Sequence, residues 1–93
     1  MQFMVYCLDK PSHLALRMET RPAHLKYLEG FTKEIVLAGP LLADDGQTMI
    51  GSLFIMEFPS RQEAEAFAAN DPFRKAGVFG SSTVTAWRKT LPK

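Results

Sequence analysis

The stretch Ile35–Phe58, IVLAGPLLADDGQTMIGSLFIMEF, decides the fold of this chain of 93 residues. Its first apolar run, Ile35–Ala38, predicts a strand that Gly39–Pro40 ends or bends, because both residue types disrupt a strand interior. The polar segment Ala43–Thr48 is typical of a turn or hairpin loop, and Gly51–Phe58 predicts a further strand. Alternation places Ser52, Phe54, Met56 and Phe58 on one face of this strand, and Leu53 and Ile55 on the other. We therefore expect two consecutive strands with no helix between them.

The segment before this stretch predicts a strand followed by helix. Phe3–Leu8 is apolar throughout and indicates a buried strand that runs into a turn. Ser12–Glu19 contains good helix formers, but Pro22 predicts a break or bend after it. Pro22 also suits the first position of a new helix, which we expect to extend to about Glu29, with His24 just inside its first turn. The inward stripe of this helix is predicted to comprise His24, Tyr27, Leu28 and Phe31.

The segment after the stretch predicts two helices and a last strand. Ser60 and Glu63 have the spacing of a capping box, which predicts a helix that begins at this point. Asn70–Gly77 indicates a second short helix with Asp71 as its cap. Thr83–Arg88 is rich in β-branched and aromatic residues and predicts the last strand.

The resulting order, β-α-β-β-α-β, predicts a single α+β domain over residues 1–93 with the ferredoxin-like arrangement, an antiparallel sheet with helices on one face. The first three strands are apolar on both faces, and two helices can cover only one face. We therefore expect the other face to pack against a second subunit in a symmetric homodimer, sheet against sheet.

Composition excludes several classes of partner and of site. Eleven basic and ten acidic side chains are scattered along the chain, so we expect neither nucleic acid nor a membrane surface as partner. There is no apolar run long enough to span a bilayer and no signal-peptide pattern. The single cysteine, Cys7, lies in an apolar run, which favours a small buried side chain in a reduced, cytoplasmic protein. His13 and His24 do not form a metal-binding pattern, so we expect neither metal nor cofactor.

His24 and Asp71 are the candidate catalytic pair. A carboxylate that accepts a hydrogen bond from one imidazole nitrogen leaves the other nitrogen free to take a proton, and it favours the imidazolium that forms. From the residues alone the alternatives stay open, because His24 can equally be a partly buried structural histidine. Asp71 before a proline can likewise be a plain helix cap.

Four further residues are candidates for substrate binding. Arg21 can hold an anionic group with its planar guanidinium, and Ser52 can donate a hydrogen bond to a ligand. Tyr6 can direct its hydroxyl into a pocket or only pack its ring. Gly39 lets the backbone approach another group closely. For Arg21 and Ser52, contact with solvent or backbone is the competing interpretation.

Taken together, the motifs resemble those of the YCII-related protein family over nearly the whole chain. They are the strand and turn Tyr6–Lys10 (YCLDK), Arg21–Leu25 (RPAHL), Ala38–Leu41 (AGPL), Gly51–Ser52, and Asp71–Phe73 running on to Ala76–Phe79. The resemblance implies a ferredoxin-like dimeric α+β barrel and an active site built on His24 and Asp71. The family includes a dehydrochlorinase that acts on a chlorinated hydroxyhydroquinone, with the His-Asp pair as proton-transfer machinery and without metal or organic cofactor. A shorter loop around Asp44–Ile50 sets this chain apart from the protein that typifies the family, so the substrate is not carried over.

Three hypotheses of function follow. The first is a cofactor-independent enzyme that uses the pair for general acid/base chemistry, an elimination, dehydrochlorination or isomerisation, on a small aromatic or oxygenated molecule. The second is a non-catalytic dimeric module that binds a small ligand or a partner. The third, a cofactor-free oxygenase or haem-handling barrel, depends on fold analogy alone.

Overall fold

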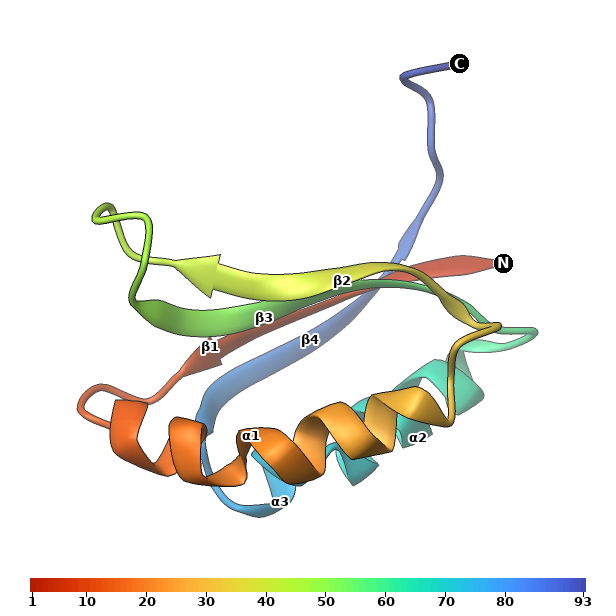
Figure 1. Ribbon diagram of the computed structural model, residues 1–93. Helices are drawn as coiled ribbons and strands as arrows, with labels where there is room; N and C mark the ends of the chain where they lie inside the picture. Colours follow the sequence, from red (N-terminus) through yellow and green to blue (C-terminus); the bar gives the residue numbers. More distant parts are fainter.

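The fold is a four-stranded antiparallel sheet with helices on one side, as the computed structural model of residues 1–93 shows (Figure 1). The strands lie side by side in the order β2-β3-β1-β4, so β1 and β3 are central. The α+β, ferredoxin-like class predicted from the sequence is confirmed. Along the chain the elements are β1 (Gln2–Asp9), α1 (Leu14–Glu29), β2 (Ile35–Leu42), β3 (Met49–Glu57), α2 (Arg61–Asn70), α3 (Pro72–Lys75) and β4 (Phe79–Trp87).

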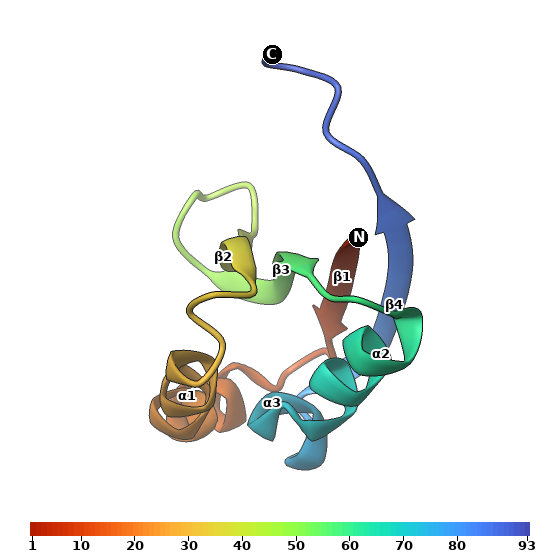
Figure 2. The ribbon, with the colours of Figure 1, turned by 90° about the vertical axis from the view of Figure 1, so that its right-hand side faces the viewer.

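The core lies between the sheet and the helix layer (Figure 2). Alternation along β1 and β3 turns one set of side chains toward the helices, and the predicted face of Ser52, Phe54, Met56 and Phe58 is buried. Burying these apolar side chains removes them from water and supplies the main driving force for folding. The core cluster comprises Phe3, Val5, Cys7, Phe54, Met56, Phe58, Ala64, Phe67, Ala68, Phe73, Val78 and Phe79.

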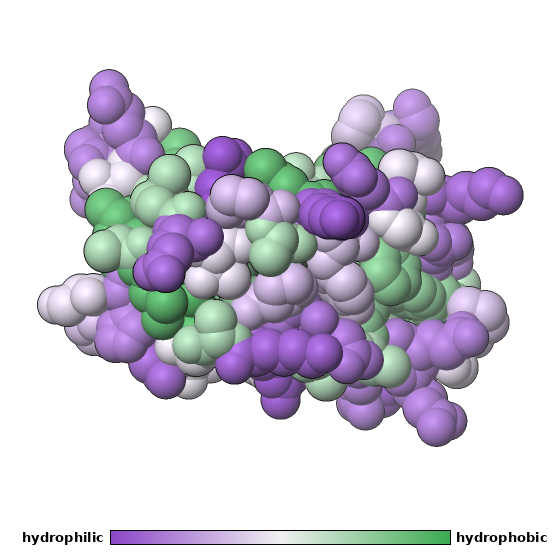
Figure 3. Space-filling view, turned by 60° about the horizontal axis from the view of Figure 1, so that its bottom comes forward, coloured by the Kyte–Doolittle hydropathy of each residue, from purple (hydrophilic) through white to green (hydrophobic).

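The two outer surfaces of the molecule differ in character. The helix layer presents mostly hydrophilic side chains with scattered apolar ones (Figure 3). The opposite face of the sheet has no helix over it (Figures 1 and 2). Large apolar side chains are exposed on that face, namely Tyr6, Leu8, Leu37 and Trp87. No helix of the structure is both long and apolar enough to cross a membrane.

The predicted break at Pro22 is wrong, because α1 is one helix of 16 residues with Pro22 inside it. A proline in a helix interior removes the bond to the carbonyl four residues earlier, here that of Met18. Both Met18 and Pro22 lie on the exposed side of α1, where water can hydrogen-bond to the carbonyl. Arg17 before the proline and His24 after it are both buried, so tertiary contacts hold the helix together across this point. His24 accordingly lies in the middle of the helix and not in a first turn.

The second strand also continues past the residues that were expected to end or bend it. β2 runs through Gly39 and Pro40 to Leu42, with register irregularities near each end. It is an edge strand with one neighbour, β3, so the missing N–H of Pro40 need not interrupt a ladder on the outer side. Pro40 pairs with Ser52, which places the edge strand beside the serine.

The second half of the chain follows the predicted caps. Ser60 accepts a hydrogen bond from the backbone N–H of Glu63 and begins α2. Asp71 caps α3 by accepting the N–H of Phe73 at 2.9 Å. Gly77 follows with a positive φ of 83°, a conformation that costs glycine little. β4 begins four residues earlier than the predicted Thr83, at Phe79.

Candidate active site

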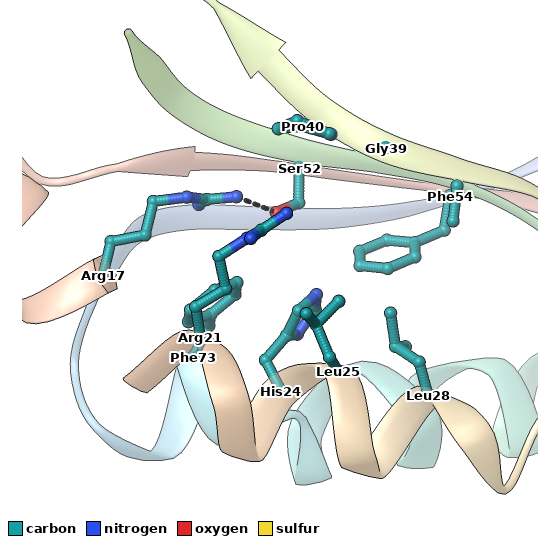
Figure 4. A pocket seen from close by; sticks show the side chains of 11 residues that line it. Arg17, Arg21, His24, Leu25, Leu28, Gly39, Pro40, Ser52, Phe54 and Phe73 are labelled. Carbon is teal, nitrogen blue, oxygen red and sulfur yellow. Dashed lines mark hydrogen bonds between the residues drawn. The ribbon is translucent and has the colours of Figure 1, made fainter. Parts of the chain in front are cut away.

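A cavity of about 180 Å³ lies between the middle of α1 and strands β2 and β3 (Figure 4). The helix supplies charged and apolar side chains on one wall, and the sheet supplies the other wall. Phe73 of α3 completes the lining. The lining residues are Arg17, Arg21, His24, Leu25, Leu28, Ala38, Gly39, Pro40, Ser52, Phe54 and Phe73.

His24 and Asp71 meet beside this cavity. The Nδ1 atom of His24 lies 2.8 Å from Oδ1 of Asp71, and both side chains are buried. A carboxylate acceptor at Nδ1 places the proton of the neutral imidazole on that nitrogen. Nε2 is then left as a lone-pair acceptor, and because His24 lines the cavity, a ligand there can present a proton to it.

The same oxygen of Asp71 has a second partner. Oδ1 also accepts the backbone N–H of Phe73 at 2.9 Å, so the cap of α3 and the imidazole share one acceptor atom. This bond fixes the carboxylate, and the carboxylate in turn fixes the ring, in the manner of a general base held by an orienting group. Asp71 does not itself line the cavity and lies behind the histidine.

Two phenylalanine rings form the apolar surroundings of the imidazole. Phe73 stacks on the His24 ring with centroids 4.0 Å apart, and Phe54 meets it edge-on at 5.9 Å. Both rings are buried. Rings in contact with the imidazole restrict its rotation and keep water from its faces.

Arg17 is a buried cation at one end of the same cavity. Its guanidinium donates to Oδ1 of Asp9 at 2.9 Å, to the carbonyl of Gly51 at 2.8 Å and to Oγ of Ser52 at 2.8 Å. It also lies over the Phe73 ring, 4.5 Å from the centroid. Burial raises the pKa of Asp9, and the neighbouring Arg17 opposes that rise. Asp9 and Arg17 thus form a desolvated ion pair. The N–H groups of Arg17 that do not bind Asp9 hold Gly51 and Ser52 near the start of β3.

The structure brings five of the six predicted site residues together. Arg21, Ser52 and Gly39 line the cavity with His24, and Asp71 supports the histidine from behind. Tyr6 is not among them, because it lies on the uncovered face of the sheet and is 36% exposed. Gly39 contributes backbone, and a Cβ added there would meet nothing within 4 Å.

Arg17 is the residue that sequence reasoning missed. Arg17, Arg21, His24 and Leu28 have spacings of four, three and four, which place them on one face of a continuous helix. The expected break at Pro22 separated the two arginines from the histidine, so the stripe could not be recognised. The signal was therefore present in the sequence, and one wrong boundary obscured it.

The donor set suits proton transfer to and from a small ligand. His24 offers a base, Arg21 offers hydrogen-bond donors on the same helix wall, and Ser52 offers a hydroxyl from β3 on the facing wall. No group of three or more His, Cys, Asp or Glu side chains is placed to hold a metal ion. One hydrogen-bond acceptor, the imidazole of His24, thus shares the cavity with several donors, and apolar side chains such as those of phenylalanine and leucine line the rest.

Comparison with solved structures gives a close neighbour with a bound ligand. A 5-chloro-2-hydroxyhydroquinone dehydrochlorinase, TftG of Burkholderia phenoliruptrix AC1100, in complex with 2,5-dihydroxybenzoquinone, matches with a TM-score of 0.89 and 38% identity, covering 97% of this chain and 96% of that one. An antibiotic biosynthesis monooxygenase matches with a TM-score of 0.54 and 12% identity over 98% of each chain, and this likeness concerns the fold alone.

Comparison of sequences gives the family. Protein YciI of Escherichia coli O6:H1 is 35% identical, and the match covers 98% of this chain and 100% of that protein. The YCII-related domain matches residues 1–88. With nearly the whole chain matched in sequence and in fold, this protein belongs to the YCII-related family.

Proposed function

We propose that the protein is a cofactor-independent enzyme in which His24, oriented by Asp71, transfers protons on a small hydroxylated ring and so drives an elimination such as dehydrochlorination. The observation that carries the proposal is the buried contact of 2.8 Å between His24 Nδ1 and Asp71 Oδ1 beside a cavity. The similarity to TftG, whose substrate is a chlorinated hydroxyhydroquinone, supports this class of chemistry.

The chemistry requires proton movement alone. A proton moved from one ring hydroxyl to the chlorine-bearing carbon gives a keto tautomer with chlorine on a saturated carbon. Removal of a proton from a second hydroxyl then expels chloride and leaves a hydroxyquinone, so the molecule loses one proton and one chloride overall. A single imidazole with a cavity-facing Nε2 can take one proton and return it within this sequence. Asp71 favours the imidazolium that exists in between.

The test is chloride release from 5-chloro-2-hydroxyhydroquinone under anaerobic conditions, corrected for the spontaneous rate. We expect turnover by the native protein and a loss of about 10²–10⁴-fold in kcat in His24→Gln, because a positioned general base contributes about that much. His13→Gln is the matched control, because His13 is the other histidine and does not line the cavity. Activity that survives in His24→Gln at the rate of the control would remove His24 from the mechanism. Ligand binding without turnover would instead favour a non-catalytic binding module.

We further propose that the uncovered face of the sheet packs against a second copy of the chain. Exposed Tyr6, Leu8, Leu37 and Trp87 lie on this face, and large apolar side chains exposed together on one face mark an interaction surface. A symmetric, isologous contact would bury the same residues of both protomers. The cytoplasm, where free thiols such as that of Cys7 stay reduced, is the location we expect.

A further inference from the structure

The hydroxyl of Ser52 can both accept and donate a hydrogen bond, and its role as acceptor is already occupied. Its side chain is 2% exposed and its Oγ accepts a hydrogen bond from Arg17 at 2.8 Å. A serine hydroxyl carries a single proton, and no protein group accepts that proton. Since Ser52 lines the cavity, Arg17 leaves the hydroxyl proton available to a ligand there.

The orientation of Arg17 is fixed from several sides. Asp9, the carbonyl of Gly51 and the ring of Phe73 all contact its guanidinium, and the side chain is 2% exposed. A guanidinium held in this way cannot rotate to donate to other acceptors. Its hydrogen bond therefore keeps the Ser52 hydroxyl in one orientation. Arg17 therefore acts on a ligand through the serine.

Arg21 is the second cation of this wall and has no protein partner. It lines the cavity, and its side chain extends from α1 toward the sheet (Figure 4). No hydrogen bond or ion pair joins it to another residue. Burial lowers the pKa of Arg17, Asp9 opposes this effect, and the positive charge of Arg21 adds to the lowering. Two like charges thus share one wall, and only one of them has a carboxylate beside it.

We propose that Ser52 and Arg21 form an oxyanion-binding subsite, with Arg17 as the positioning residue that directs the Ser52 hydroxyl into it. This inference rests on the proposed function and narrows its substrate class. The ligand is a small ring that carries an ionised oxygen for Arg21 and Ser52, and a hydroxyl whose proton Nε2 of His24 accepts. Enols and phenols conjugated with a carbonyl group have this character, and so do the keto tautomer and the hydroxyquinone product of the proposed reaction. A cavity of about 150 Å³ holds a benzene ring, so the cavity of about 180 Å³ admits one ring with small substituents.

The first experiment compares two ligands that differ in charge. 2,5-Dihydroxybenzoquinone is ionised at neutral pH, whereas its two-electron reduced form, 1,2,4,5-tetrahydroxybenzene, has the same heavy atoms and is neutral. We expect calorimetric titration at pH 7, without oxygen, to show tighter binding of the ionised ligand. Arg21→Gln should weaken the ionised ligand at least about tenfold more than the neutral one, since hydrogen bonds to charged groups are the stronger ones. Arg88→Gln, which removes the same charge just after β4, is the control and should leave the preference unchanged.

The second experiment is a double-mutant cycle that isolates the role of Arg17. Ser52→Ala and Arg17→Lys are each expected to reduce the preference for the ionised ligand. The double variant should show no further reduction than Ser52→Ala alone, because Arg17 acts through the serine. A purely structural role for Arg17 would instead weaken both ligands equally, and by the same factor with or without Ser52.

Binding is measured without turnover, so this inference and the proposed function fail separately. An unchanged preference in Arg21→Gln and Ser52→Ala would overturn the subsite whatever the enzyme catalyses. Additive effects of Arg17→Lys and Ser52→Ala would overturn the positioning role of Arg17. Loss of chloride release in His24→Gln with the preference for the ionised ligand intact would support both. Should Arg17→Lys fail to fold, the Arg21 and Ser52 variants alone still decide whether the subsite exists.

Discussion

Arg17 and His24 lie seven positions apart on α1 and are the two buried residues of that helix. Seven residues make nearly two full turns, so both side chains point to the same cavity although one is a fixed cation and the other a base. Phe73 contacts both of them. One continuous face of α1 thus carries both the base, His24, and Arg17, which binds Ser52 on the opposite wall.

Replacing the carboxylate by an amide separates the charge of Asp71 from its hydrogen bonds. In Asp71→Asn the amide oxygen can still accept the N–H of Phe73 and of His24, so we expect the fold to persist. The imidazolium formed during reaction loses its neighbouring negative charge, and kcat should fall by about 10²-fold or more. Steady-state kinetics with circular dichroism as a folding control would measure this. Unchanged kcat would show that the carboxylate serves only the cap of α3.

Gly51 is expected to tolerate no side chain. A Cβ at this position would lie 2.4 Å from the backbone oxygen of Cys7 and 2.9 Å from a side-chain carbon of Leu41. Gly51→Ala should therefore lower the free energy of unfolding by about 1–3 kcal/mol through overpacking. Gly39→Ala is the matched control, because nothing lies within 4 Å of its added Cβ. Urea denaturation of both variants measures the difference, and equal stabilities would contradict the close approach.

Asp9 is expected to matter for stability more than an exposed carboxylate does. In Asp9→Asn the buried guanidinium of Arg17 loses its counter-ion, and breaking a buried ion pair costs about 3–5 kcal/mol. The bonds from Arg17 to Gly51 and Ser52 remain, so we expect a loss near the lower end of that range. Asp44→Asn, in the exposed loop, should change the free energy of unfolding by less than about 0.5 kcal/mol. Similar losses in both variants would show that the pair contributes nothing beyond a surface charge.

The free energy of unfolding should decline at alkaline pH because of Cys7. Burial raises the pKa of this thiol from 9.0 to about 11, and its hydrogen bond to Ser82 opposes that rise. The folded state therefore holds the proton more tightly than the unfolded state, so stability falls as the pH rises from about 9 to about 11. Urea denaturation between pH 8 and 11 should show a shallower decline in Cys7→Ala. Parallel curves for the two proteins would contradict the prediction.

The self-association proposed for the sheet face can be tested with a charge. Leu37 is 53% exposed on that face, so Leu37→Glu leaves a single protomer intact while placing a carboxylate in the expected contact. We expect light scattering to report a dimer for the native protein and a smaller species for this variant. Met18→Glu is the control, because Met18 is 48% exposed on α1 in the helix layer. A native monomer would refute the dimer, and the same mass for both variants would refute the sheet face as its contact.

Local patterns were sufficient to predict the element order and the core face of β3. Alternation over Gly51–Phe58 and the cap at Ser60 depend on neighbouring residues, and the structure confirms both. The continuity of α1 through Pro22 could not be obtained in this way, because it depends on contacts that Arg17 and His24 make with distant strands and with α3. The extension of β2 past Pro40 likewise follows from its place at the sheet edge.

The candidate site was also predictable only as far as local patterns reach. The residue types at His24 and Asp71 suggested a pair, but 47 intervening positions left their meeting undetermined until the fold brought them to 2.8 Å. Arg17 stayed hidden because a buried arginine has no local signature apart from the helical stripe that the assumed break removed. The position of Tyr6 depends on strand parity, since its neighbours Val5 and Cys7 point into the core.

One carboxylate oxygen starts α3 and also steadies the imidazole. Under the proposed function this sharing has a consequence for evolution: we expect the acid to be kept for folding where the reaction is no longer selected, whereas the base is not. Relatives that have become inactive should accordingly have lost the histidine first and kept the aspartate, so the order of decay at these two positions would distinguish former enzymes from working ones.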